Sequence, residues 1–403
     1  MVEPKTIAPV LNFQSPHLLE LPPLSLYIHF PWCIKKCPYC DFNSHEIGSG
    51  ANDLPEKEYL SALLRDLEAA LPQIWGRSIS SIFIGGGTPS LLSASGLEQL
   101  LSQVRMLLLL EPSVEITLEA NPGTFESKKF KAFREAGVNR LSIGVQSFNT
   151  EQLLKLGRIH NANEARHAIE ISQHYFDNIN LDLMYALPNQ TIEEARLDIE
   201  TACTTGVPHI SAYHLTLEPN TMFYQYPPQL PDDDLSADMQ ALIEQTLKGS
   251  GFAQYEISAF AHAGHRSHHN LNYWQFGDYL GIGAGAHSKI SFRDKIVRQM
   301  RYKHPKKYLE VLLSESVTPI QMEQELEVAD RIFEFMMNSL RLIEGFRLED
   351  FRSRTGLPII AAQQQLKVAE QMGLIHRDCH RIVPTDIGRK FLNDLLQIFL
   401  PNK

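Results

Sequence analysis

Hydrophobic positions between Leu24 and about Pro219 follow two alternating spacings. Short runs rich in apolar and β-branched residues predict buried strands; these are Ser25–Phe30, Ser81–Ile84, Glu115–Glu119, Arg140–Val145, Asn178–Met184 and His209–Leu217. Between the runs, apolar residues recur every three or four positions, which predicts amphipathic helices. The predicted helices are Glu56–Leu71, Leu97–Leu110, Ser127–Glu135, Ala162–His174 and Ile192–Thr204.

This repetition of strand and helix predicts an α/β fold built on a parallel sheet with right-handed crossovers. Six units are fewer than the eight of a closed barrel, so we expect an open, six-stranded partial (βα)6 barrel. A doubly wound sheet is the alternative. In both architectures the loops at the carboxyl ends of the strands carry the chemistry.

The remaining sequence divides the chain into four expected parts. Residues 1–23 form a Pro-rich N-terminal arm, and residues 24–226 form the barrel. Residues 227–320 extend it, starting at a linker over Pro227–Asp234 and including a strand at Tyr255–Phe260. Residues 321–403 are mostly helical with a hairpin at Leu374–Thr385, a pattern that resembles a winged-helix module.

Composition limits the partners of the chain. Its 403 residues carry a net charge of −10 and are 43% hydrophobic. An acidic surface argues against nucleic acid or anionic membrane as the main partner. The longest apolar run, Met106–Leu110, is too short to span a bilayer, and the N-terminus lacks the pattern of a signal peptide. We therefore expect a cytoplasmic protein.

Three of the five cysteines, Cys33, Cys37 and Cys40, lie in a C-x3-C-x2-C motif directly after the first predicted strand. Thiolates bind iron–sulfur cubes. Three of them leave one iron of a [4Fe–4S] cluster open, and the amino and carboxylate groups of S-adenosylmethionine (SAM) can chelate that iron. A zinc site is the alternative, but zinc prefers four closed ligands, and only His29 and His45 are near.

The other two cysteines, Cys203 and Cys379, are isolated in the sequence. We expect them to be buried small hydrophobic residues.

Unusual polar and glycine residues follow or close three of the other predicted strands, and one more lies on the fifth strand, which indicates one site at one edge of the sheet. They are Gly85–Thr88, Glu119, Gln146 and Asp182. The glycines alone are also compatible with a sharp turn, and the two carboxylates with salt bridges at the barrel rim. A later segment, Gly281–Ala286, imitates a dinucleotide-binding loop, but it lacks the acidic partner and indicates a tight turn near the site.

Taken in order, these motifs resemble the radical SAM superfamily. The resemblance is to the group of oxygen-independent coproporphyrinogen III oxidases and HemW-type heme chaperones, and it covers roughly Leu24 to Leu400. The segments that carry it are LSLYIHFPWCIKKCPYCDF, IFIGGGTPSLL, ITLEANPGT, NRLSIGVQSF, LGRIHN, NLDLMYALP, HLTLEPNT, HNLNYW and YLGIGAGAHS.

The resemblance implies roles for particular residues. Cys33, Cys37 and Cys40 match the ligands of the [4Fe–4S] cluster. The positions that match SAM contacts are Tyr27, Tyr39, Gly86, Gly87, Thr88, Glu119, Gln146, Arg158 and Asp182. The physical chemistry agrees, since an arginine fork pairs with a carboxylate and carboxylates accept from ammonium or hydroxyl groups.

Two features separate the two branches of this group. The oxidases have a further cysteine two residues after the third ligand, where this chain has Asp41 and Phe42. The segment His269-Asn-Leu-Asn-Tyr-Trp274 matches the H-N-x-x-Y-W motif of the heme chaperones, so His269 is the candidate heme contact, with the adjacent His268 as another candidate. A packed aromatic corner with a hydrogen-bonded histidine is the structural alternative.

The resemblance therefore predicts a heme chaperone that passes heme to acceptor hemoproteins such as respiratory enzymes. It further implies a homodimer linked to the cluster and peripheral contact with membrane-bound acceptors. No catalytic residue is assigned, and coproporphyrinogen oxidation remains the alternative activity. A DNA-binding role for the C-terminal module is disfavoured, since its basic residues form no continuous stripe.

Overall fold

The computed structural model describes residues 17–47, 54–124, 127–314 and 318–401. Its main sheet has the strand order β14-β13-β12-β11-β1-β4-β5-β6-β7-β8-β10-β9. Six of these strands match the predicted runs and pair in parallel, each with the next along the chain. They are β1 (Leu24–Phe30), β4 (Ser78–Gly86), β5 (Leu109–Ala120), β6 (Arg140–Gln146), β7 (Ile179–Tyr185) and β8 (His209–His214).

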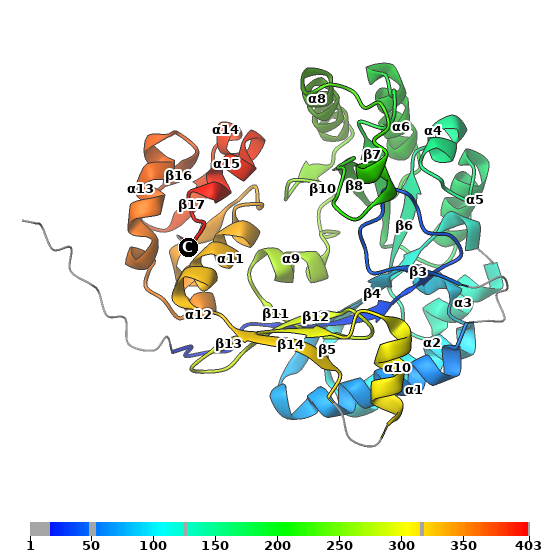
Figure 1. The fold of residues 1–403 in the computed structure, drawn as a ribbon. Coiled ribbons are helices and arrows are strands. Elements are labelled where there is room, and N and C mark those ends of the chain that lie inside the picture. Colours follow the sequence, from blue (N-terminus) through cyan, green and yellow to red (C-terminus); the bar gives the residue numbers. More distant parts are fainter. Residues whose placement is uncertain (1–16, 48–53, 125–126, 315–317, 402–403) are drawn as a thin grey trace, which may run out of the picture.

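The sequential order of these six strands decides between the two expected architectures. A doubly wound sheet reverses its strand order at a switch point, and no reversal occurs from β1 to β8. The helices cover the outer, convex face of a curved sheet (Figure 1), and the prediction of a partial barrel is confirmed. The covering helices are α1 (Glu56–Ala70), α2 (Ala94–Leu107), α3 (Ser127–Glu135), α4 (Thr150–Lys155), α5 (Ala162–Gln173), α6 (Ile192–Thr204) and α8 (Asp233–Gly249).

Two predicted boundaries were wrong. The helix expected over Leu97–Leu110 ends at Leu107, and Leu109 already begins β5. A continuous apolar run is compatible with both periods, so the sequence left this boundary open. The strand expected at Tyr255–Phe260 is two short strands, β9 (Ala253–Gln254) and β10 (Ala259–Ala261), which pair with each other in antiparallel fashion.

Further strands extend the barrel on the other side of β1. Strand β11 (Asp278–Ile282) pairs in parallel with β1, and an antiparallel meander follows it. The meander consists of β12 (His287–Ser291), β13 (Ile296–Arg301) and β14 (Ile320–Glu325), with α10 (Pro305–Leu313) between the last two.

Helix α9 (His268–Trp274) contains the HNLNYW segment and lies on the concave side of the sheet, against β1, β4 and β11. Figure 1 shows it between the barrel and the C-terminal module.

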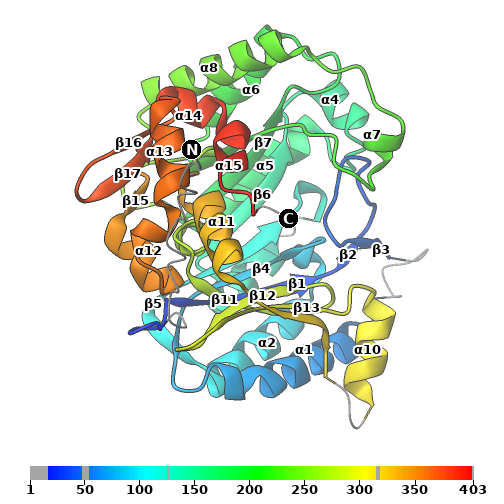
Figure 2. The ribbon, with the colours of Figure 1, turned by 60° about the vertical axis from the view of Figure 1, so that its left-hand side comes forward.

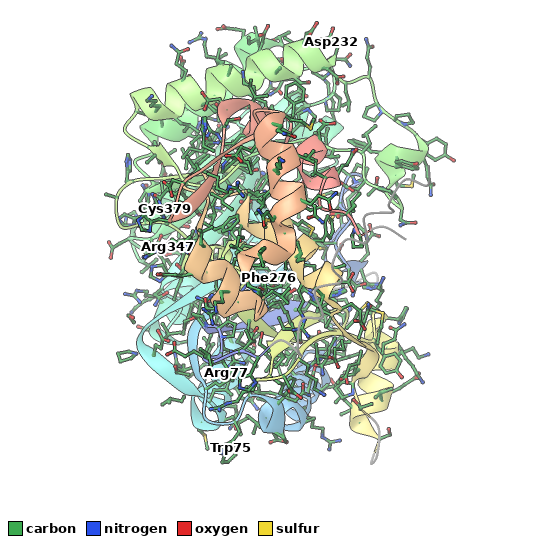
Figure 3. All side chains as sticks on the ribbon, turned by 90° about the vertical axis from the view of Figure 1, so that its left-hand side faces the viewer. Trp75, Arg77, Asp232, Phe276, Arg347 and Cys379 are labelled. Carbon is green, nitrogen blue, oxygen red and sulfur yellow. The ribbon has the colours of Figure 1, made fainter. Side chains whose placement is uncertain are left out.

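The C-terminal module has its own hydrophobic core, and α11 packs on α9. It combines helices with a small sheet of order β15-β17-β16, as the winged-helix pattern predicted. Figures 2 and 3 show the module in front of the barrel, and Figure 3 labels Phe276 near the junction of the two. Its elements are α11 (Val328–Ser339), β15 (Phe346–Arg347), α12 (Leu348–Thr355), α13 (Gln363–Gln371), β16 (Ile375–Arg377), β17 (Arg381–Pro384), α14 (Asp386–Lys390) and α15 (Leu392–Gln397).

Three other expectations concern single features. Most of the N-terminal arm, residues 1–16, lies outside the described residues, whereas Leu18 is buried in the core of the C-terminal module. Cys203 is half-buried, but Cys379 is exposed in the turn after β16, so its predicted burial was wrong. Within the described residues, no helix combines the length and the apolar character that crossing a membrane requires.

Candidate functional site

A pocket of about 370 Å³ opens at the carboxyl ends of the parallel strands. Eleven residues singled out in the sequence line it, together with residues from β7, β8 and the loop after β8. The eleven are Cys33, Cys37, Tyr39, Cys40, Gly86, Gly87, Thr88, Glu119, Gln146, Arg158 and Asp182. The expectation that one edge of the sheet gathers the unusual residues is therefore confirmed.

The three pocket cysteines sit on a loop from Cys33 to Asn43, which we call the cluster loop. The protein holds this loop from two sides. On one side the Phe223 amide donates to the Pro38 carbonyl at 3.0 Å, where α7 (Met222–Gln225) lies beside the loop (Figure 2). On the other, the Asn43 side chain donates to the carbonyls of Ala284 and Lys303 at 2.9 and 2.8 Å. The turn at Gly281–Ala286 thus supports the cluster loop.

The glycines after β4 allow the backbone to approach the cluster loop closely. Gly87 donates its amide to the Phe30 carbonyl at 2.7 Å, and a Cβ at Gly87 would lie 2.4 Å from the Trp32 carbonyl oxygen. Gly86 has φ +113°, a backbone conformation that glycine adopts readily and other residues rarely adopt. A non-glycine residue at either position would therefore displace the chain beside the cysteines.

Arg158 joins the cluster loop to β6. One terminal nitrogen of its guanidinium donates to the Cys37 sulfur at 3.5 Å, and the other donates to the Gly144 carbonyl at 2.8 Å. Its Nε is buried and has no hydrogen-bond partner among the residues that the structure describes. A carboxylate in the pocket would supply the missing acceptor, since an arginine fork binds carboxylates with two parallel bonds.

Two carboxylates form the floor of the pocket. Burial, followed by repulsion from Asp182, raises the pKa of Glu119 to about 7, although the Gly86 amide donates to it at 3.0 Å. Burial also raises the pKa of Asp182, against the opposing effect of donors from Ser142 and Asn180. A ligand with ammonium or hydroxyl donors would compensate this accumulation of negative charge.

These features fit a [4Fe–4S] cluster with SAM. The three half-buried cysteines share a pocket with an arginine whose Nε has no acceptor among the described residues, and with two carboxylates whose pKa burial raises. The zinc alternative fits less well, because no three His, Cys, Asp or Glu side chains within the described ranges converge on a single ion. His29, one suggested fourth ligand, is engaged by Tyr27 and by the Asn43 carbonyl.

Two predicted site residues lie outside the pocket lining. Tyr27 points its hydroxyl at His29 Nδ1, 2.9 Å away, and stacks on Phe83. His269 also stacks on Phe83, and the centroids of these two rings are 5.0 Å apart. The structure thus places Tyr27 and His269 deeper in the barrel, next to the pocket and not at its surface.

The environment of His269 is that of a packed, hydrogen-bonded histidine. Its side chain is 3% exposed, and Nδ1 lies 3.0 Å from the Ser81 hydroxyl. Burial and the charge of Arg140 lower its pKa to about 3, so the imidazole is neutral. The Glu115 carboxylate accepts from the amides of His268 and His269, both at 3.1 Å, and so fixes the N-terminus of α9.

Some pocket residues were not found from the sequence. Ser142 and Met184 lie on the same face of β6 and β7 as Gln146 and Asp182, and Tyr213 lies near the end of β8. The period of two along each strand could have indicated them, since alternate residues face the same side. Lys35 of the cluster loop also lines the pocket.

Comparison with known families agrees with this geometry. The family model described as the radical SAM superfamily matches residues 27–202, and that of the HemN C-terminal domain matches residues 326–391. A solved structure of Escherichia coli coproporphyrinogen III oxidase (HemN), described as a radical SAM enzyme, superposes with a TM-score of 0.79. The match covers 94% of this chain and 90% of that one at 24% identity, so it shows the fold.

Several curated relatives match over nearly their whole length. The heme chaperone HemW of Haemophilus influenzae is 48% identical, over 94% of this chain and 99% of that protein. Its Escherichia coli counterpart is 46% identical over 95% and 100%, and that of Bacillus subtilis is 35% identical over 93% and 99%. The chain therefore belongs to the HemW family of radical SAM proteins.

Proposed function

We propose that this chain is a heme chaperone that binds heme, a [4Fe–4S] cluster and SAM, and delivers heme to acceptor hemoproteins. The observation that carries the proposal is the 48% identity to a heme chaperone over 94% of the chain, in a structure whose three motif cysteines line one pocket. Respiratory enzymes are the proposed acceptors.

Within this proposal, Cys33, Cys37 and Cys40 would hold the cluster, and the rest of the same pocket would hold SAM beside it. Arg158 orients the SAM carboxylate, while Glu119 and Asp182 accept from its ammonium and hydroxyl groups. When bound and reduced, the cluster can supply an electron to split SAM. The residues around it position SAM and exclude water.

The proposed heme-associated segment is α9, which holds the HNLNYW sequence. Because His269 is buried and bonded to Ser81, contact between its imidazole and heme iron requires α9 to move away from β4. His268 is exposed on the same helix and needs no such movement. The cluster is proposed to support this conformational change or dimerisation, and the acceptors to include membrane-bound proteins.

A heme titration tests the proposal. The wild-type protein with reconstituted cluster should bind heme with defined stoichiometry and transfer it to an apo-hemoprotein, as followed by visible spectra. His269→Ala and His268→Ala, with the distant exposed His174→Ala as matched control, locate the contact. Absence of stoichiometric heme binding by the wild type would contradict the function.

Anaerobic oxidation of coproporphyrinogen III is the second candidate, favoured by the shared fold with HemN. Phe42 lies where the oxidases have a further cysteine, and its side chain is 57% exposed at the pocket. The assay combines anaerobic protein with SAM, a reductant and coproporphyrinogen III. Robust formation of protoporphyrinogen would reject the chaperone as the main function.

A further inference from the structure

A continuous chain of buried hydrogen bonds connects the floor of the pocket with the N-terminus of α9. It consists of Asp182, Asn180, His209, Tyr255 and Ser267, and we call it the buried chain. All its members except Asp182 are at most 2% exposed, and Ser142, which bonds to both Asp182 and Asn180, is 6% exposed. Buried polar groups of this kind fix one arrangement when all are satisfied.

At the pocket end, the chemistry of the partners fixes the orientation of each group. The Asn180 amide nitrogen donates to Asp182 Oδ1 at 2.9 Å, and the Ser142 hydroxyl donates to Oδ2 at 2.8 Å. An ionised carboxylate only accepts, so the amide nitrogen of Asn180 must face Asp182. The amide oxygen of Asn180 consequently faces the opposite way, toward His209.

His209 holds this amide oxygen in place. The two residues are register partners on β7 and β8, and His209 Nδ1 lies 2.6 Å from Asn180 Oδ1. Because an amide oxygen only accepts, Nδ1 carries the proton. Burial, followed by the charges of Arg140 and His265, lowers the pKa of His209 well below its usual value, so Nε2 carries none.

The free Nε2 of His209 then accepts from the Tyr255 hydroxyl at 2.8 Å. The same hydroxyl accepts from the Ser267 amide at 3.3 Å, and Ser267 is the N-cap of α9. Tyr255 also contacts the C-terminal module, because its carbonyl accepts from the Ile343 amide at 3.1 Å. Each hydrogen bond in the buried chain is therefore donated in the same direction, from α9 toward the pocket.

We infer that His209 is a positioning residue for SAM: through Asn180 it fixes the Asp182 carboxylate, and through Tyr255 it couples that carboxylate to α9. The inference rests on the proposed function, in which Asp182 contacts SAM. The Ser211 hydroxyl also donates to Asn180 Oδ1, at 2.9 Å, so loss of the proton on His209 Nδ1 removes one of the two donors that hold this oxygen. SAM would then meet a carboxylate whose orientation is held less firmly.

The test measures SAM affinity in protein with reconstituted cluster, by equilibrium dialysis and by the SAM-induced change in the cluster EPR signal. His209→Leu should weaken SAM binding on the order of tenfold, the effect of losing one hydrogen bond that supports a charged group. His209→Gln keeps a donor and an acceptor and should recover affinity to within about threefold.

His262→Leu is the matched control. This histidine stacks on Phe252 and bonds to the Gly251 carbonyl at 3.1 Å, outside the buried chain. It should lower thermal stability without changing SAM affinity. If His209→Leu does not fold, Tyr255→Phe removes a single hydroxyl from the buried chain and should still weaken SAM binding.

Hydrogen–deuterium exchange provides a readout that a merely structural role would leave unchanged. SAM should slow exchange in the peptide containing α9 in the wild type, but not in His209→Leu at saturating SAM. Equal SAM affinity of folded His209→Leu and wild type would overturn the inference alone. A wild type that binds no SAM would overturn the proposed function as well.

Discussion

Glu119 is the residue at which the pocket makes the sharpest prediction about pH. Burial and the neighbouring Asp182 raise its pKa to about 7 in the unliganded protein. SAM donors require the ionised carboxylate, so SAM binding must release a proton below that pH. With the protonated form excluded from binding, the SAM dissociation constant should increase about thirtyfold from pH 8 to pH 5.5.

The assay is equilibrium dialysis of labelled SAM across this pH range with anaerobic, cluster-loaded protein. Glu119→Gln should weaken binding at pH 8 and remove most of the pH dependence. Glu218→Gln is the matched control, because it neutralises another carboxylate that lines the same pocket. It should leave the pH profile of the wild type in place.

Protein stability gives an independent check on the same carboxyl group. Its folded pKa lies above the unfolded value of 4.5, so its stabilising contribution is complete below pH 4.5 and is lost as pH rises through 7. Without SAM, Glu119→Gln should gain stability relative to wild type over this window, by at most about 3 kcal/mol. A SAM affinity of the wild type that does not vary between pH 5.5 and 8 would refute the reasoning.

Three further predictions address the cluster, the glycine turn and the barrel wall. Cys33→Ala, Cys37→Ala and Cys40→Ala should each lose most of the bound iron and sulfide in elemental analysis, whereas Cys203→Ala should retain them; retention in any of the three contradicts the ligand assignment. Gly87→Ala places a Cβ 2.4 Å from the Trp32 carbonyl oxygen and should weaken SAM binding more than tenfold by dialysis, while Gly249→Ala, with open space around its Cβ, should bind SAM normally. Asp278→Ala leaves Lys289 and Arg77, 2.7 and 2.8 Å away, without their buried partner. It should cost about 3–5 kcal/mol in urea unfolding at pH 7, and a cost no larger than that of the exposed Asp386→Ala would contradict this.

The barrel and most of the pocket were predictable because the pattern of residues within each short segment determines its strand or helix. A period of two identifies each parallel strand, and parallel strands bring their carboxyl ends to one edge. Cys33, Glu119 and Gln146 follow a strand or lie at its end, and Asp182 lies within one, so their convergence in one pocket required no long-range information. The motif spacing then indicated the chemistry.

The position of α9 was not predictable, because distant residues determine it. Glu115, more than 150 positions earlier in the chain, accepts from the first amides of this helix. Aromatic residues of β1, β4 and β11 surround His269 in the folded chain. The HNLNYW segment alone therefore shows a histidine near aromatic residues but not which strands it packs against. The buried chain is hidden for the same reason, since Asn180 and His209 look like ordinary polar positions of two strands.

The contacts of Tyr27 were also not predictable from the sequence, although its partners lie close to it along the chain. Its sequence position predicts a SAM contact, and the strand period puts it on the same face as His29. The structure places its hydroxyl on the His29 ring, which in turn meets the Asn43 carbonyl of the cluster loop. Only the folded chain reveals that Tyr27 reaches the cluster loop through another side chain.

The most direct measurement is Mössbauer spectroscopy of anaerobically reconstituted, ⁵⁷Fe-labelled protein with and without SAM. The account predicts four irons per chain in a cube held by Cys33, Cys37 and Cys40, with SAM changing the signal of a single iron. Tetrahedral zinc in place of iron, or a cube with four protein ligands that does not respond to SAM, would contradict it.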